Sequence, residues 1–303
     1  MTMLRIDSKT KEASRCAVVT GANKGIGFEI CRQLASNGIT VLVTARDEKK
    51  GLEAVEKLRA YGFSDQLISF HQLDVTDSAS IATLANFVKT HFKKLDILIN
   101  NAGIPGADVD PDALLTWIKY RTIDGTKVTP QNFEAAEATV KTNYHGAKET
   151  IEALINLLQL SDSPKIINVS SNIGRLEYMP NGWPKEVLND VENITEEKIQ
   201  NILNQFLKDL KEGSLEIKGC WPISTPAYIL SKAALNALTR ILAKKYPSFC
   251  INAVHPGFVK TDMTQNLGVL TPNEGAESVV RLALLPNGSP SGLFFFREKE
   301  TSF

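Results

Sequence analysis

The chain has no net charge and no long apolar run. Lysine and arginine together number 34, which equals the number of aspartates and glutamates. Balanced charge provides no field that would hold nucleic acid or an anionic membrane surface, so charge predicts no macromolecular partner. No stretch of eighteen apolar residues occurs among the 303, which excludes an obvious membrane-spanning helix.

Cysteine and histidine are also scarce. The four cysteines form no C-x-x-C pair and lie among apolar residues, so we expect buried free thiols in a reducing compartment. The first fourteen residues are polar and lack the apolar core of a signal peptide, which predicts a flexible tail and a cytoplasmic protein. The histidines are not at metal-ligand spacing and no metal is expected, although His145 could line a pocket; they are His71, His91, His145 and His255.

From Arg15 onward, short β-branched runs alternate with amphipathic segments of helical length. This alternation is typical of a mainly parallel sheet covered by helices on both faces, and it predicts one doubly wound α/β domain of the Rossmann type over residues 15–303. Seven strands are expected, at Cys16–Thr20, Thr40–Thr44, Leu67–Leu73, Leu95–Ile99, Lys165–Val169, Cys250–Val254 and Leu293–Phe296. The helices are expected at Ile26–Asn37, Lys49–Ala60, Ala79–Phe92, Phe133–Leu158, Tyr228–Tyr246 and Asn273–Leu284.

Two stretches interrupt this alternation, at residues 104–131 and 177–225, and the second contains a predicted helix at Thr195–Lys211. Both follow the carboxyl ends of strands, where open α/β sheets bind ligands, so we predict that these insertions build a substrate pocket. They could instead be surface decoration. Apolar residues near these segments suggest an apolar substrate, although they could equally pack in the core or a lid; they are Ile104, Met179, Trp183 and Phe258.

A glycine-rich turn joins the first strand to the first helix. Glycines in the G-x-x-x-G-x-G pattern let backbone N–H groups and the helix N-terminus approach a pyrophosphate. The alternative is a turn whose glycines serve only packing. The residues predicted to contact a dinucleotide here are Gly21, Asn23, Lys24, Gly25, Ile26 and Gly27.

The end of the second strand indicates which dinucleotide is bound. An NAD enzyme would offer a carboxylate to the ribose at this position, but this chain has Ala45 followed by Arg46. A guanidinium at Arg46 and an ammonium at Lys24 would both favour a 2′-phosphate, so the sequence predicts NADPH.

The next two strands also end in candidate cofactor contacts. Asp74 and Val75 follow the third strand, where the carboxylate could meet the adenine amino group or simply begin a turn. Small residues follow the fourth strand and would let a cofactor lie against the backbone, although the same residues are ordinary in turns; they are Asn101, Ala102 and Gly103.

Tyr228 and Lys232 are four residues apart in a predicted helix, so their side chains share one face. A phenol with an unperturbed pKa of about 10 is a poor proton donor and acceptor at neutral pH unless a cation stabilises its phenolate. Lys232 is placed to be that cation. On its own, such a pair is more often two surface residues of an amphipathic helix.

Taken together, Thr20–Gly27, the Asn-Asn-Ala-Gly turn at 100–103, Ser171 and Tyr228-x-x-x-Lys232 resemble the short-chain dehydrogenase/reductase family. The resemblance implies that Tyr228 is the general acid for carbonyl reduction, and that Lys232 lowers its pKa and binds the nicotinamide ribose. It also implies that Ser171 or Ser170 binds the substrate oxygen and that Asn143 holds a water leading to Lys232. After the sixth strand, it implies nicotinamide contacts from Pro256, Gly257, Val259 and Thr261.

The distance between Ser171 and Tyr228 is 57 positions, whereas most family members separate these residues by about a dozen. Such an insertion is similar to that of the carbonyl-reductase-like branch, in which it covers a tetramer interface, so a monomer is expected. Within that branch the chain resembles the plant group of neomenthol dehydrogenase and salutaridine reductase through residues 23–31, 70–77, 157–164 and 290–295.

This resemblance implies NADPH-dependent reduction of an apolar cyclic ketone, of terpenoid or alkaloid type, or of a reactive carbonyl. Two alternatives remain open at the level of the sequence. One is reduction of an enone C=C bond, as in a sister enzyme of the group that has glutamate in place of the tyrosine retained here as Tyr228. The other is a non-catalytic NADPH-binding sensor.

Overall fold

The computed structural model describes residues 15–106 and 131–303. Its centre is an eight-stranded sheet in the order β3-β2-β1-β4-β5-β6-β7-β8, in which every neighbouring pair is parallel except β7 and β8. The strands are β1 (Cys16–Val19), β2 (Thr40–Ala45), β3 (Ile68–Gln72), β4 (Ile97–Asn100), β5 (Lys165–Val169), β6 (Cys250–His255), β7 (Phe294–Phe296) and β8 (Lys299–Thr301). The predicted doubly wound α/β domain is confirmed.

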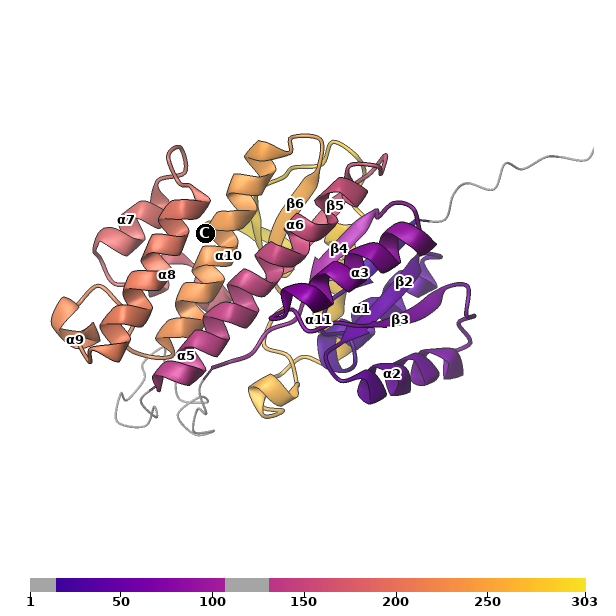
Figure 1. Cartoon of the computed structure of the whole chain (residues 1–303), viewed down its shortest axis with the longest axis horizontal. Helices are drawn as coiled ribbons and strands as arrows, with labels where there is room; N and C mark the ends of the chain where they lie inside the picture. The colour runs from indigo at the N-terminus through magenta and orange to yellow at the C-terminus, as the bar shows by residue number, and fades with distance from the viewer. Residues whose placement is uncertain (1–14, 107–130) are drawn as a thin grey trace, which may run out of the picture.

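Helices cover both faces of this sheet (Figure 1). One face carries α1 (Gly25–Ser36), α2 (Glu48–Ala60) and α11 (Pro272–Ala283). The other carries α3 (Ser78–His91), α5 (Phe133–Val140), α6 (Gly146–Leu158) and α10 (Pro226–Lys245).

Side-chain alternation along the strands explains the two layers. In β1, Cys16 and Val18 belong to one apolar core, while Ala17 and Val19 belong to the core on the opposite face. Successive side chains of a strand point to opposite faces, so a strand covered on both sides needs apolar residues at every position.

The insertion at 177–225 folds into α7 (Trp183–Asn189), α8 (Glu196–Lys211) and α9 (Leu215–Lys218). These helices lie beside α5 and α10, at the end of the molecule away from α2 (Figure 1). The helix predicted at Thr195–Lys211 is confirmed as α8, and Thr195 caps it by accepting a hydrogen bond from the backbone N–H of Lys198. The short helices α7 and α9 were not predicted.

Two further features depart from the sequence expectation. An eighth strand, β8, pairs antiparallel with β7 and was missed because its three residues are all polar and form no β-branched or apolar run. The long helix predicted at Phe133–Leu158 is divided by a π-helical turn, η2 (Lys141–His145). The hydrophobic periodicity is nearly the same on either side of such a turn, so it leaves little trace in the sequence.

The order of the strands in the sheet predicts where a ligand-binding crevice lies. β1 is hydrogen-bonded to β2 on one side and β4 on the other, so the chain reverses its direction of winding between β1 and β4. In doubly wound sheets this switch point opens a crevice at the carboxyl ends of the strands. Among the described residues, no helix is both long and apolar enough to cross a membrane.

Candidate active site

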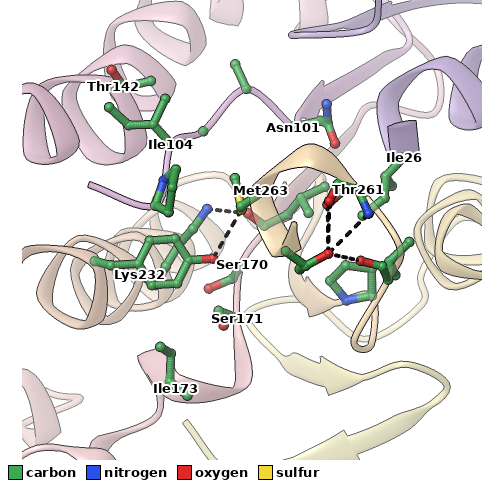
Figure 2. A pocket seen from close by; sticks show the side chains of 18 of the residues that line it. Ile26, Asn101, Ile104, Thr142, Ser170, Ser171, Ile173, Lys232, Thr261 and Met263 are labelled. Carbon is green, nitrogen blue, oxygen red and sulfur yellow. Dashed lines mark hydrogen bonds between the residues drawn. The ribbon is translucent and has the colours of Figure 1, made fainter. Parts of the chain in front are cut away.

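A cleft of about 1480 Å³ opens at the carboxyl ends of the strands. Pockets for single drug-sized ligands are usually about 300–1,000 Å³, so this cleft has room for a cofactor and a substrate together. Figure 2 shows Lys232, Ser170, Ser171 and Met263 gathered in one part of the cleft, with Ile26, Asn101 and Thr261 in another. All the residues predicted to contact the cofactor line this cleft: Gly21, Asn23, Lys24, Gly25, Ile26, Gly27, Arg46, Asp74, Val75, Asn101, Ala102, Gly103, Tyr228, Lys232, Pro256, Gly257, Val259 and Thr261.

The glycine-rich turn presents an uncapped helix N-terminus to the cleft. Helices α2, α3, α5, α8 and α11 are all capped by a side chain, whereas α1 begins after Lys24 with no side-chain cap and no acidic residue in its first turn. Unpaired N–H groups and the positive end of the helix dipole suit a pyrophosphate.

Two glycines of this turn are required by geometry. Gly21 has a φ of +62°, and a Cβ there would lie 2.9 Å from the Cα of Ala102. A Cβ on Gly27 would lie 2.5 Å from the Nδ2 atom of Asn101. The backbone of the turn therefore lies against the end of β4, which leaves the cleft side open for a dinucleotide.

Asn101 holds the turn in that position. Its side-chain amide donates to the carbonyl oxygens of Thr20 and Gly21 at 2.9 and 3.0 Å. The Thr20 hydroxyl accepts from the backbone N–H groups of Asn101 and Ala102, both at 2.9 Å. Asn101 thus shapes the cofactor cradle with its side chain, in addition to lining it.

Arg46 and Lys24, the two cations predicted to favour a 2′-phosphate, differ in their ion pairing. Both line the cleft, and the Arg46 guanidinium forms no ion pair with the described residues. Lys24 forms an ion pair with Asp262, and both side chains are exposed. A phosphate at this place would therefore meet Arg46 directly, but would compete with Asp262 for Lys24.

Asp74 combines the two interpretations left open by the sequence. One carboxylate oxygen accepts from the backbone N–H and the hydroxyl of Thr76, at 2.9 and 2.7 Å, as a turn residue does. Burial raises the pKa of Asp74, but these hydrogen bonds outweigh burial and the net shift is downward. The carboxylate is ionised and still faces the cleft.

At the other end of the cleft, α10 carries Tyr228 and Lys232 on one face. The Lys232 ammonium donates to the carbonyl oxygen of Val169 at 2.9 Å and lies 5.8 Å from the centre of the Tyr228 ring. The Tyr228 hydroxyl donates a weak hydrogen bond to the Met263 thioether at 3.9 Å. Met263 therefore rests over the hydroxyl of the candidate acid.

The structure separates the two serines. The Ser170 hydroxyl donates a hydrogen bond to the side-chain oxygen of Asn236 on α10 at 2.6 Å, so its proton is already used within the protein. The Ser171 side chain is instead near enough to the Tyr228 phenol to lower its pKa. Ser171 is therefore the serine placed to share a substrate oxygen with Tyr228.

Burial controls the protonation of the pair. Desolvation raises the pKa of Tyr228, and the nearby Ser171 hydroxyl opposes this shift only in part. Desolvation also lowers the pKa of Lys232 to about 8. The net shift of the Tyr228 pKa is upward, so burial outweighs any lowering by Lys232 while the ammonium is directed at the Val169 carbonyl.

Asn143 lies in the π-helical turn η2 and is 1% exposed, so it stands behind the cleft wall. Its side-chain amide donates to the Ile104 carbonyl at 3.0 Å and to the Ser231 hydroxyl at 3.1 Å, and its oxygen accepts from the Ile104 N–H at 2.9 Å. The Ser231 hydroxyl in turn donates to the Tyr228 carbonyl at 2.9 Å. Asn143 thus ties the end of β4 to the helix that carries Tyr228.

The predicted pocket residues divide into two groups. Ile104, Met179 and Phe258 line the cleft, whereas Trp183 does not and instead packs on Trp221. Trp183 follows Gly182, and its ring turns toward the insertion helices rather than the cleft. Sequence reasoning missed many of the lining residues because nothing in their spacing marks them; among them are Tyr178, Ile223, Asp262 and Met263.

The fold and this site define an oxidoreductase with a dinucleotide cradle at one end of the cleft and a tyrosine, serine and lysine at the other. The family model described as short chain dehydrogenase matches residues 15–182. The chain belongs to the short-chain dehydrogenase/reductase family.

Several characterised relatives are similar along almost their whole length. A short-chain dehydrogenase/reductase 1 from Saponaria officinalis is 56% identical, with 95% of this chain and 96% of the relative aligned. A (+)-neomenthol dehydrogenase from Arabidopsis thaliana is 54% identical over 97% and 99% of the two chains. A (-)-isopiperitenone reductase from Mentha piperita is 50% identical over 95% and 98%.

Solved structures give the same grouping. Salutaridine reductase from Papaver somniferum superposes with a TM-score of 0.84 at 50% identity, covering 93% of this chain and 99% of that one. Menthone neomenthol reductase from Mentha piperita has a TM-score of 0.84 at 46% identity, covering 94% and 99%. An NADPH-bound carbonyl reductase from chicken fatty liver has a TM-score of 0.65 at 26% identity, covering 96% and 99%.

Proposed function

We propose that this enzyme uses NADPH to reduce the carbonyl group of an apolar cyclic ketone, of terpenoid or alkaloid type, to an alcohol. The observation that carries the proposal is the arrangement at the Tyr228 end of the cleft. There Tyr228, Ser171 and Lys232 meet beside the apolar side chains of Ile104, Met179 and others that line the cleft.

Tyr228 acts as the general acid. Its raised pKa keeps the phenol protonated at neutral pH, which is the form that can donate a proton to the oxygen of a reduced carbonyl. Once the proton has left, the Lys232 ammonium is the nearby positive charge that stabilises the phenolate. The lysine must therefore be charged for the acid to work.

Ser171 orients the substrate. Its hydroxyl is beside that of Tyr228, so a carbonyl oxygen placed between them can accept a hydrogen bond from each. The same two bonds strengthen as negative charge develops on that oxygen. For this to occur, Met263 must give up its contact with Tyr228 to the substrate.

NADPH fits the residues at the other end of the cleft, and when bound it supplies the hydride. The uncapped start of α1 and the glycine cradle would hold the pyrophosphate, and Arg46 with Lys24 would hold the 2′-phosphate. Gly103 leaves the nicotinamide end open, because a Cβ there would lie 3.2 Å from the Asn143 side-chain oxygen and 3.6 Å from the Lys232 ammonium.

The choice of substrate class rests on the character of the cleft and on the relatives. Both Met179 and Ile104 are apolar and face the cleft, and an exposed Ile223 stands at its rim. The relatives named for menthone, neomenthol and salutaridine support a cyclic ketone substrate. We further propose that the enzyme acts in plant specialised metabolism and that it is cytoplasmic.

A second candidate is reduction of a C=C bond conjugated to the ketone. The isopiperitenone reductase that is 50% identical to this chain keeps this possibility open. Tyr228 argues against it, because an acid beside Ser171 is placed to protonate oxygen rather than carbon. The two reactions give different products from one enone, an allylic alcohol or a saturated ketone.

The test is NADPH oxidation by the purified enzyme with saturated cyclic ketones, enones and simple quinones, followed by chromatographic identification of each product. Alcohols from saturated ketones support the proposal. Products reduced only at C=C would establish the second candidate, and NADPH binding without turnover of any carbonyl would indicate a cofactor-binding sensor.

A further inference from the structure

A buried carboxylate lies outside the active site, in the insertion. Asp209 of α8 is 2% exposed. One of its oxygens accepts from the Trp221 indole N–H at 2.8 Å, and the other accepts from the Gln205 amide at 2.7 Å. No lysine or arginine in the described parts of the chain forms an ion pair with it, so the buried carboxyl group is held by the neutral donors of Trp221 and Gln205.

A buried polar group of this kind contributes little to the free energy of unfolding. Replacing buried ionic groups with apolar side chains of similar volume is often neutral or stabilising, so the carboxylate is better explained by what it fixes in place. What it fixes is Trp221, a 2%-exposed side chain at the end of the insertion.

Trp221 joins the two ends of the insertion. Its ring packs edge-on against Trp183, with centroids 5.8 Å apart, and against Phe206 at 5.6 Å. Beside this pair, Gly182 has a φ of +147°, and a Cβ there would lie 2.7 Å from the Cβ of Cys220. The chain entering α7 and the chain leaving α9 are thus in direct contact.

The segments flanking this contact form one side of the cleft. Tyr178, Met179 and Pro180 line the cleft just before Gly182, and residues 222–225 line it just after Trp221. This second segment leads through Thr225, which has a φ of +44°, into the helix that bears Tyr228. A β-branched residue in the left-handed region is strained and keeps this conformation only when both flanks are held.

We propose that Asp209 is a positioning residue for the substrate. Through Trp221, it fixes the wall formed by residues 178–180 and 222–225, and that wall selects bulky cyclic ketones. The inference rests on the proposed function and deepens it. The cofactor end of the cleft belongs to other elements, so NADPH binding should not depend on Asp209.

Two variants of matched size test the role. Asp209→Leu removes both acceptors and leaves the buried Trp221 N–H unpaired. Asp209→Asn is the control, because its side-chain oxygen can still accept a hydrogen bond from the Trp221 N–H. Its side-chain NH₂ can donate to Gln205 once the Gln205 amide group rotates to present its oxygen. Trp221→Phe removes the donor from the other side, and thermal unfolding verifies that each variant folds.

The kinetic probes are menthone and cyclohexanone, which share the reacting ring and differ in their alkyl substituents. We expect Asp209→Leu to lower kcat/KM for menthone ~10-fold or more and for cyclohexanone less than ~2-fold, since a displaced wall misplaces only the larger ketone. Trp221→Phe should behave like Asp209→Leu. The Asp209→Asn variant should stay near wild type, and the Kd for NADPH should not change in any variant.

An equal loss for both ketones, no loss in Asp209→Leu, or an equally impaired Asp209→Asn would each overturn the proposal. If the wild-type enzyme reduced neither ketone, the proposed substrate class would fail, and the positioning role would still be decided by NMR. In that case the methyl resonances of Ile223 and the indole N–H of Trp221 must shift in Asp209→Leu and persist in Asp209→Asn. Unchanged Ile223 resonances in the leucine variant would refute it.

Discussion

Tyr228 shows how much of a residue's role depends on its surroundings. The spacing to Lys232 predicts a shared face of α10, and the structure confirms that the two side chains lie close together. The pKa directions could not be obtained from spacing, because they depend on burial by segments distant in the sequence. Burial raises the pKa of Tyr228 and lowers that of Lys232.

Tyr228→Phe is the direct test of the acid. The ring and its packing remain while the proton donor is lost, so turnover should fall by about 10²-fold or more, the usual contribution of general acid catalysis. NADPH binding, measured by fluorescence titration, should stay near the wild-type value. Substantial ketone reduction by this variant would show that another group donates the proton.

The pH dependence of reduction should follow Lys232. Its pKa of about 8 means that the ammonium is charged below pH 8 and neutral above it. The charged form stabilises the Tyr228 phenolate, so kcat should be level at lower pH and decline as the pH rises through about 8. A Lys232→Arg variant, whose side chain stays charged, should lack this decline in whatever activity it retains. A profile unchanged between the two enzymes would exclude Lys232 as the titrating group.

The predicted preference for NADPH over NADH depends chiefly on Arg46. Its guanidinium has no ion-pair partner among the described residues and faces the cleft, so a 2′-phosphate would gain a direct partner there. Arg46→Asp should raise the KM for NADPH by about 10-fold or more and that for NADH much less, because the phosphate meets repulsion in place of attraction. Equal effects on both cofactors would place the phosphate elsewhere.

At the scale of elements, the 3₁₀ helix η5 (Asp262–Thr264) connects the two ends of the cleft. Asp262 pairs with Lys24 of the glycine turn, and the next residue, Met263, covers Tyr228. The cofactor phosphate and Asp262 therefore compete for one lysine.

This competition predicts a gain in affinity. Asp262→Asn frees Lys24 and removes a negative charge near the phosphate, so the Kd for NADPH should fall about 2- to 5-fold, in the range of one exposed ion pair. Titration with NADH supplies the control, since its affinity should barely change. The gain should also shrink at high salt. Tighter binding of both cofactors alike would mean that η5 acts through shape and not charge.

The elements that the sequence predicted are those with strong periodicity. β1 is an uninterrupted apolar run, β5 has apolar side chains at three of its five positions, and α8 and α11 begin at clear caps, Thr195 and Thr271. The π turn around Asn143, the strand β8 and the contact of Trp183 with Trp221 were not predicted. Each depends on tertiary packing, which a local pattern does not encode. The glycine turn was predicted because close backbone approach restricts residue type directly.

For the molecule as a whole, the insertion bears on assembly. Helix α8 packs on α5 and α10, and α7 packs on α10; this cover is the basis for proposing a monomer. Light scattering of the purified enzyme should give about the chain mass of 33.3 kDa, both with and without NADPH. A stable dimer or tetramer at micromolar concentration would refute the proposed role of the insertion in assembly.

The close contact between Gly182 and Cys220, at the two ends of the insertion, has a consequence for enzyme engineering. A segment whose two ends touch can be exchanged as a unit, because the rest of the chain needs only to supply two adjacent attachment points. Grafting residues 182–221, with their flanking wall residues, between relatives of this enzyme should transfer ketone preference while leaving the cofactor unchanged. Divergence of substrate range within the family could proceed by the same route, through one cassette and without alteration of the catalytic groups.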